Sequence, residues 1–208
     1  MGDGNTVELL GFYGGDETHA LSAWTSTSRD LIEDKRGRLG KLLKDLAEAG
    51  HETPFEKSFL HFLVTTDIAT HIHLIKHRIG VSVNAESARY KELKDDKFYI
   101  PNDWPEHLKY SLAEFITDAQ GRYHMAVEGL TPMLGRKRAK ESARFFLPYA
   151  TQITADVGLN FRSFIHFQRL RNSEHAQKEV REVAQEMLRL TRETGAFNLS
   201  LEAFGYGS

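Results

Sequence analysis

Residues 67–78 read DIATHIHLIKHR, and after eight more residues the chain continues with SARY at residues 87–90. Asp67 can accept hydrogen bonds from the first free backbone N–H groups of a helix, and the apolar spacing after it predicts a helix that ends at about Arg78. The buried face of this helix is expected to consist of Ile68, Ile72 and Ile75, and the face with polar donors of His73, Lys76 and His77. Cationic, imidazole and hydroxyl groups thus gather in one short window, as the recognition of an anionic ligand requires.

The segments on either side of this window have the apolar spacing of strands and helices. Short β-rich runs predict strands at residues 7–13, 59–65, 98–100 and 149–157. Helical spacing predicts helices at residues 16–29, 36–49, 103–129, 136–147 and 160–171, and at 174–194 with Ser173 as its cap. Residues 79–94 lack sustained periodicity and are expected to be loop. These elements predict one α+β domain over residues 1–208, in which a mixed or antiparallel sheet packs against several long helices.

Composition limits the functions that this chain can have. The 208 residues, with 40% hydrophobic content, suffice for the core of one domain, and a formal net charge of −2 gives no overall attraction to nucleic acid or to an anionic membrane. No cysteine is present, which excludes disulfides, thiolate metal sites and a thiol nucleophile. The first residues do not read as a secretion signal, and no apolar run approaches the roughly 18 residues of a membrane span. A soluble cytoplasmic protein is therefore expected.

Polar groups without an evident structural purpose concentrate at residues 50–57, 73–90 and 160–177 and at Arg144. His71, His73 and His77 could form a metal site, but the chain has no H-E-x-x-H motif, so no metal is expected. Phosphate-loop, dinucleotide-turn and nucleophile-elbow motifs are missing from the sequence as well. From the residues alone we infer only that the chain binds a phosphorylated or otherwise anionic small molecule through Arg, His and Ser side chains.

Five motifs resemble those of the flavin-dependent thymidylate synthases. The family's signature is Arg-His-Arg, a spacer of seven or eight residues, and then Ser-x-Arg, and Lys76-His77-Arg78 with Ser87-Ala88-Arg89 is similar to it. The other matching segments are Gly50–Glu56, Arg144 with Leu147-Pro148, Asn160-x-Arg162-Ser163, and Leu170-Arg171 with His175-Ala176-Gln177. Because these motifs keep the family's order and spacing over most of the chain, the match is specific.

The resemblance implies an activity and an assembly. The activity is the reductive methylation of dUMP to dTMP, with FAD as the redox cofactor, NADPH as the reductant and methylenetetrahydrofolate as the one-carbon donor. The assembly is a homotetramer whose active sites are shared between subunits, without nucleic acid or membrane as a partner. In this family no enzyme nucleophile adds to the pyrimidine, which agrees with the missing cysteine.

Individual roles follow from the resemblance in the same way. The residues expected to bind the flavin are Thr53, Glu56, Lys76, His77, Arg78, Ile79, Asn160, Arg162, His166 and His175. The residues expected to hold the nucleotide are His73, Glu86, Ser87, Ala88, Arg89, Arg144 and Arg171. Arg171, beside the pyrimidine by analogy, is the candidate catalytic residue, because it could stabilise negative charge on the ring carbonyls. Arg89, Arg144 and Arg171 are expected to form one clamp on phosphate and base.

Three positions depart from the family's pattern, and one of them is Lys57, which follows Phe-Glu where members often have a histidine. Lys76 and His73 stand where members commonly have Arg and Gln, and a lysine holds an anion as a point charge rather than through a planar pair of donors. A methylase that accepts UMP as well as dUMP, as in nucleoside-antibiotic pathways, therefore stays open as an alternative. So does a flavin- or nucleotide-binding protein without turnover.

Overall fold

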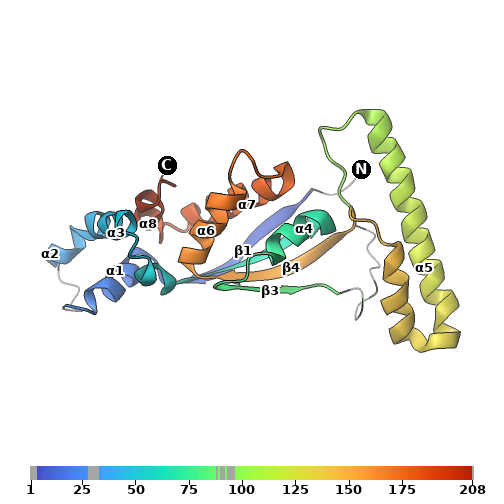
Figure 1. Ribbon diagram of the computed structural model, residues 1–208, viewed down its shortest axis with the longest axis horizontal. Helices are drawn as coiled ribbons and strands as arrows, with labels where there is room; N and C mark the ends of the chain where they lie inside the picture. The colour runs from blue at the N-terminus through green and yellow to red at the C-terminus, as the bar shows by residue number, and fades with distance from the viewer. Residues whose placement is uncertain (1–3, 28–32, 88, 90–91, 93–96, 208) are drawn as a thin grey trace. The chain divides into compact units, whose positions relative to one another are not determined.

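The computed structural model describes residues 4–27, 33–87, 89, 92 and 97–207. Within these residues the strands form one sheet in the order β1-β2-β4-β3 (Figure 1). Their bounds are Thr6–Tyr13 for β1, Phe59–Asp67 for β2, Val81–Ala85 for β3 and Gln152–Leu159 for β4. Neighbouring strands run antiparallel, and helices connect them, so the expected α+β class is confirmed.

The chain divides into two compact units, and each strand passes from one unit into the other along its length. Unit 1 contains Met1–Thr6, Val64–Lys76 and Asn84–Ala155, and unit 2 contains Val7–Leu63, His77–Val83 and Asp156–Ser208. The expectation of one domain over residues 1–208 stays a prediction. Within the described residues, no helix is both long and apolar enough to cross a membrane.

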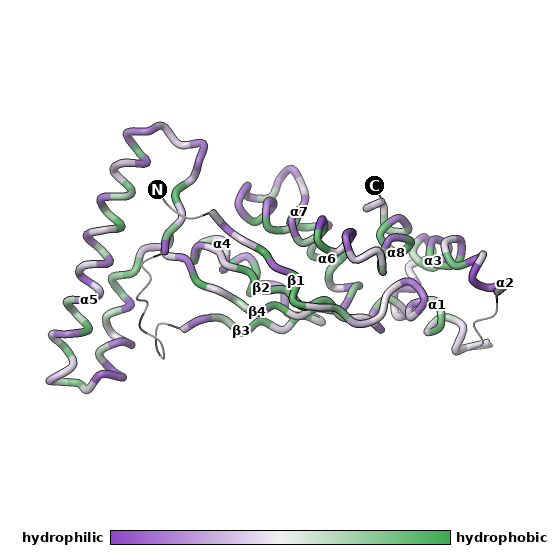
Figure 2. Tube along the Cα trace, turned by 180° about the vertical axis from the view of Figure 1, so that it is seen from behind, coloured by the Kyte–Doolittle hydropathy of each residue, from purple (hydrophilic) through white to green (hydrophobic). Residues whose placement is uncertain are grey.

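Unit 1 is built around a long helix that turns back on itself. This helix, α5, spans Glu106–Ala143, and its backbone leaves the helical region at Gly135, with φ 75° and ψ 151°. Figure 1 shows the two arms of α5 side by side, and in the core of the unit Ala143 packs with Tyr123 and Val127. Polar and apolar residues alternate along both arms (Figure 2). The two helices expected at 103–129 and 136–147 are therefore confirmed with shifted ends; the 3-10 turn η2, Arg144–Phe146, follows them.

Helix α4, Ile68–Ile75, begins as expected but buries a different face. Asp67 caps it by accepting a hydrogen bond from the backbone N–H of Thr70 at 2.8 Å. The expected stripe is wrong, because Ile75 is exposed and the buried residues are Thr70, His71 and Leu74. An eight-residue helix with apolar groups on several sides has no single stripe to read, and the packing of the unit selects the face.

Unit 2 packs its helices around an aromatic core. Its elements are α1 Asp16–Trp24, α2 Glu33–Arg36, α3 Leu39–Glu48, the 3-10 turn η1 Thr53–Glu56, α6 Phe161–Arg171, α7 Lys178–Glu193 and α8 Asn198–Ala203. Helix α3 lies against α1 and α8 (Figure 1), and η1 lies against α6. Phe55, Phe161 and Phe197 are fully buried, and the last two stack with ring centroids 5.3 Å apart.

Several expected elements differ from the structure. Residues 79–94 are not all loop, because the alternating residues of β3 pair with β4; a five-residue alternation is too short to stand out in the sequence. At the expected strand 98–100 only a single bridge forms, between Phe98 and Thr151. The helix expected at 16–29 ends at Trp24, and residues 28–32 lie outside the described residues. Helix α7 begins after Gln177, because the Ser173 hydroxyl accepts a hydrogen bond from the backbone of His175 in a turn instead of capping the helix.

Candidate functional site

Helix α6 carries the largest group of expected site residues. Asn160 caps it, since its Oδ1 accepts a hydrogen bond from the backbone N–H of Ser163 at 2.8 Å. Phe161, Phe164 and Ile165 are buried, and helical spacing therefore places Arg162, His166 and Arg169 together on the opposite, exposed face. The sequence thus determines which α6 residues a ligand can reach.

The turn at residues 77–80 is fastened to the start of α6. The Ser163 hydroxyl donates a hydrogen bond to the Ile79 carbonyl at 2.8 Å, and the Asn160 N–H donates to the Gly80 carbonyl at 3.3 Å. Gly80 has φ +64°, and a Cβ atom there would lie 2.3 Å from the Ser163 hydroxyl oxygen, so only glycine fits. The turn leaves the side chain of Ile79 92% exposed.

His77 and Arg171, expected on the flavin and on the nucleotide respectively, contact each other. Arg171 Nε donates a hydrogen bond to His77 Nε2 at 2.9 Å, across 94 positions of sequence. The His77 ring also meets the ring of Phe167 edge-on at 4.9 Å and that of His166 at 6.0 Å between centroids. His77 is therefore held by the C-terminal half of α6.

Arg162 forms ion pairs with two carboxylates, those of Glu56 in η1 and of Glu52, the residue just before η1. Arg162 Nε donates to Glu52 at 2.9 Å, and Arg162 Nη1 donates to Glu56 at 2.5 Å. Glu52 also pairs with Arg169 at 3.5 Å. The hydrogen bonds from Arg162 to Glu56 and then to Glu52 raise the pKa of the Arg162 guanidinium above its ordinary value. The four formal charges of these residues cancel.

Glu52 is a residue that the sequence reasoning missed. It lies in the matched segment Gly50–Glu56, one helical turn before Glu56, but the resemblance assigns it no role. Its contacts become visible only when η1 lies against α6. Ser163 and Gly80 were missed for the same reason.

In unit 1, the side chains of Glu86 and Arg89 both form hydrogen bonds within the protein. Glu86 accepts a hydrogen bond from the Thr154 N–H at 3.0 Å through its Oε2, and its own N–H donates to the Thr154 carbonyl at 2.8 Å. Arg89 Nε donates to Glu141 at 2.5 Å, and this contact lowers the pKa of the Glu141 carboxyl. The Arg89 N–H also donates to the Ser87 hydroxyl at 3.3 Å. Ala88 lies outside the described residues.

The remaining expected residues are less constrained. Thr53, Lys76, Arg78, Arg144 and His175 are exposed, while His73 on α4 is half-buried. Within the described part of the chain, the side chains of Arg78 and Arg144 form no ion pair. Both are therefore available to an anionic ligand.

The residues expected on the flavin and those expected on the nucleotide lie mostly in different units. All the residues expected on the flavin belong to unit 2 except Lys76, and all those expected on the nucleotide belong to unit 1 except Arg171. The structure thus brings three of the flavin motifs together at α6. The clamp of Arg89, Arg144 and Arg171 combines residues of both units and stays a prediction.

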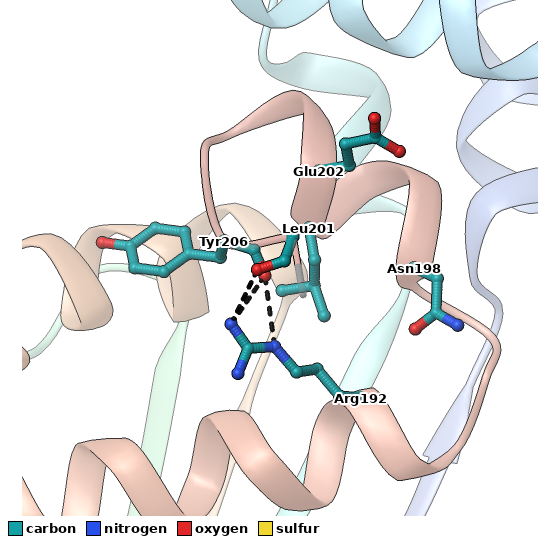
Figure 3. A pocket seen from close by; sticks show the side chains of 6 residues that line it. Arg192, Asn198, Leu201, Glu202 and Tyr206 are labelled. Atoms are coloured by element: carbon teal, nitrogen blue, oxygen red, sulfur yellow. Dashed lines mark hydrogen bonds between the residues drawn. The ribbon is translucent and has the colours of Figure 1, made fainter.

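A surface cavity of about 380 Å³ lies elsewhere in unit 2, at the C-terminal end of the chain (Figure 3). Its lining consists of Arg192, Asn198, Leu201, Glu202, Tyr206 and Gly207. The guanidinium of Arg192 already has partners within the protein, because it donates hydrogen bonds to the carbonyls of Tyr206 and Gly207 at 2.9 and 3.1 Å. None of the expected site residues lines this cavity, so we do not assign the activity to it.

Known proteins resemble this chain over nearly its whole length. The flavin-dependent thymidylate synthase of Pseudothermotoga lettingae is 33% identical over 189 residues, which cover 88% of this chain and 82% of that protein. The enzyme of the same name from Streptomyces avermitilis is 31% identical, over 83% of this chain and 77% of its own. The crystal structure of a UMP/dUMP methylase, PolB from Streptomyces cacaoi, bound with 5-Br dUMP, superposes with a TM-score of 0.81 at 27% identity, covering 99% of this chain and 97% of that one.

The family model described as thymidylate synthase complementing protein matches residues 8–194. This range contains every motif of the resemblance, including the three that converge on α6. The resemblance inferred from the sequence is therefore confirmed. The chain belongs to the thymidylate synthase complementing protein family, the family of the flavin-dependent thymidylate synthases.

Proposed function

We propose that the protein converts dUMP to dTMP, using methylenetetrahydrofolate as the one-carbon donor and NADPH as the reductant of a bound FAD. As a member of its family the chain is an enzyme, a methyltransferase that depends on a flavin. The observation that carries the proposal is the convergence of Thr53–Glu56, residues 77–80 and Asn160–His166 at α6. These are three of the segments that resemble the family.

The residues of unit 2 offer what a flavin dinucleotide requires. Ile79 presents an exposed apolar side chain that an aromatic ring can cover, and Arg78 presents an exposed cation for a phosphate. The cluster of Glu52, Glu56 and Arg162 with Arg169 carries no net charge, so it suits neutral hydroxyl and amide groups of the cofactor better than phosphates. When bound, the flavin supplies the electrons that complete the new methyl group.

The protein's part in the reaction is to bind and orient the substrates. Without a cysteine no thiolate of this chain can add to the pyrimidine, and the proposed role of Arg171 is to stabilise negative charge on the ring carbonyls. Arg144 and Arg89 would hold the nucleotide phosphate, for which Arg89 has to exchange its contact with Glu141. The reaction would balance as follows: the methylene group of methylenetetrahydrofolate passes to the pyrimidine and is reduced to a methyl group, NADPH and a proton are consumed with formation of NADP⁺, and the folate is released as tetrahydrofolate.

We also propose that the protein works as a homotetramer in the cytoplasm. An apolar strip on α5 supports association, since the exposed Leu108 and Phe115 and the half-buried Leu112 between them lie one turn apart on one flank of the helix. Neighbouring exposed apolar side chains of this kind are a candidate interaction surface. The active sites would then be shared between copies of the chain.

A second candidate, methylation of UMP as well as dUMP, is favoured by one specific observation. PolB is described as a UMP/dUMP methylase, and its solved structure resembles 99% of the present chain. Lys76 and His73, which depart from the common family residues, are both expected close to the bound ligands. They are the residues whose identity could widen the choice of sugar.

The test is a turnover assay with product analysis. Purified protein with FAD is mixed with methylenetetrahydrofolate and either dUMP or UMP, with and without NADPH. We expect dTMP and tetrahydrofolate only when the reductant is present. Sustained dTMP formation without reductant, or dihydrofolate as the stoichiometric product, would contradict the proposal. Methylation of UMP at a comparable rate would establish the second candidate, and bound flavin without any product would indicate a binding protein.

A further inference from the structure

Arg171, the last residue of α6, uses only part of its guanidinium within unit 2. Its Nε–H donates to His77 Nε2 at 2.9 Å. The two Nη groups of Arg171 have no hydrogen-bond partner among the residues that the structure describes. An arginine held in this way through Nε presents both Nη groups to a ligand in a fixed plane.

His77 can hold Arg171 because its own position is fixed. Phe167, which is 4% exposed, meets the His77 ring edge-on at 4.9 Å, and His166 lies on the same helix at 6.0 Å. The segment after His77 is tied to the start of α6 by the Ser163 and Ile79 hydrogen bond. The imidazole of His77 therefore packs against the side chains of α6, and the turn that follows it is hydrogen-bonded to the same helix.

The direction of the hydrogen bond determines the protonation of His77. An arginine guanidinium carries hydrogen on Nε and remains protonated in proteins, so it can only donate. His77 Nε2 must accept, which requires a neutral ring with its proton on Nδ1. Protonation of Nε2 would replace the acceptor by a second donor and place two cations side by side.

We propose that His77 is a positioning residue that, as the neutral Nδ1–H imidazole, holds Arg171 in the orientation that binds the pyrimidine nucleotide. The inference deepens the proposed function and rests on it for the identity of the ligand. It gives His77 a role separate from contact with the flavin. It also makes nucleotide affinity depend on pH through His77. Among the residues that the structure describes, the charged or titratable groups that face His77 or flank it include Arg171 and His166 on α6, and Lys76 and Arg78 beside it in sequence.

The first experiment needs no ligand. Nitrogen NMR of histidine-labelled protein reports which ring nitrogen carries the proton, and loss of a signal in His77→Gln identifies the resonance of His77. We expect Nε2 of His77 to be unprotonated at pH 8. A proton on Nε2 at that pH overturns the inference whatever the protein's activity is.

The second experiment measures dUMP affinity of the FAD-loaded protein by calorimetry between about pH 5.5 and pH 8, the range in which an ordinary histidine titrates. His77→Leu removes the acceptor, and we expect it to weaken dUMP binding about tenfold or more at pH 8, within the roughly 10- to 150-fold range of a lost charged hydrogen bond. His77→Gln keeps an uncharged acceptor. We expect it to restore most of the affinity at pH 8 and to bind with a shallower loss at acidic pH than the wild type.

His51→Gln is the matched control, because it removes an exposed imidazole that has no expected ligand contact and leaves the hydrogen bond between Arg171 and His77 in place. The dUMP phosphate itself titrates near pH 6, so each variant is compared with the wild type on the same ligand. Wild-type affinity in His77→Leu, or an unchanged acidic loss in His77→Gln, refutes the role of His77 while leaving the proposed function intact. Failure of the wild type to bind dUMP refutes both.

Discussion

At the scale of single residues, His19 of unit 2 is held by burial and by hydrogen bonds at both ring nitrogens. It is fully buried, and both ring nitrogens make hydrogen bonds, at 2.8 Å to the Ser200 hydroxyl and at 2.7 Å to the Ser58 hydroxyl. Ser200 in turn donates to Asp16 at 2.6 Å. Burial lowers the pKa of His19 from 6.5 to about 4. The network joins α1, α8 and Ser58, the residue before β2, and burial favours the neutral form of the His19 ring.

This depressed pKa predicts a loss of stability in acid. Between the unfolded pKa near 6.5 and the folded pKa near 4, the unfolded chain binds a proton at this site and the folded chain does not. The stabilisation is therefore complete above pH 6.5 and is lost as the pH falls toward 4, by about 3 kcal/mol in total. Urea unfolding of the wild type and of His19→Gln at a series of pH values measures the difference.

We expect His19→Gln to be less stable at pH 7 but to lose less stability across this window. The exposed His51 offers a control, because His51→Gln changes the number of histidines without changing the buried network. Parallel curves for the wild type and His19→Gln would show that another group governs the acid sensitivity.

A second prediction at this scale concerns Glu52. Glu52→Gln keeps the shape of the side chain but removes the charge that holds Arg162 and Arg169. Because these arginine side chains are about half exposed, each ion pair contributes only about 0.5–1 kcal/mol. We expect FAD to bind about two- to fivefold more weakly, measured by quenching of its fluorescence.

The matched control is Glu48→Gln, which breaks an exposed pair with Lys44 on α3. It should leave FAD affinity unchanged. Equal FAD affinity in Glu52→Gln and the wild type would mean that Glu56 alone orients Arg162.

At the scale of elements, the reversal of α5 depends on one backbone conformation. Gly135 has φ 75° and ψ 151°, a region that side chains with a Cβ atom rarely adopt. Gly135→Ala should therefore destabilise the protein by about 1–3 kcal/mol, measured by thermal or urea unfolding. Apart from its chain neighbours and the helix's own backbone, no described atom lies within 4 Å of the added methyl group, so the cost comes from the backbone conformation and not from a clash.

Gly129→Ala is the control for this prediction. Gly129 lies in the helical part of α5, and a Cβ atom added there would meet no described atom within 4 Å beyond its chain neighbours and the helix's own backbone. There alanine should stabilise the protein by about 0.5–1 kcal/mol, because it restricts the unfolded chain and suits a helix. Destabilisation of the same size in both variants would show that the conformation of Gly135 is not what matters.

At the scale of the whole molecule, the proposed association of subunits leads to a test on α5. Phe115 is 58% exposed within the apolar strip, and a charge there would have to be buried in any interface that covers it. Phe115→Glu should therefore give a smaller species than the wild type in light scattering after gel filtration. Tyr110→Glu is the control, because Tyr110 is 74% exposed on the opposite side of the helix. A wild-type mass in Phe115→Glu would exclude this strip from the interface.

The sequence by itself determined the features that depend on local chemical identity. Asp67 was readable as a helix cap, the order of the motifs identified the family, and the missing cysteine excluded a thiolate nucleophile. Such features need only the residue types and their spacing, because a cap or a helix face involves neighbours within four positions. The start of α4 was predictable for this reason.

Only the tertiary structure decided which distant residues meet. The buried face of α4 is set by the packing of its unit and not by the periodicity of the helix itself. Glu52 contacts Arg162 because η1 packs against α6. The pairing of His77 with Arg171 joins residues 94 positions apart that the resemblance assigned to different ligands. A local pattern carries no information on contacts of this kind, because they depend on how separately formed elements pack and on the hydrogen bonds that remain to be satisfied once they have packed.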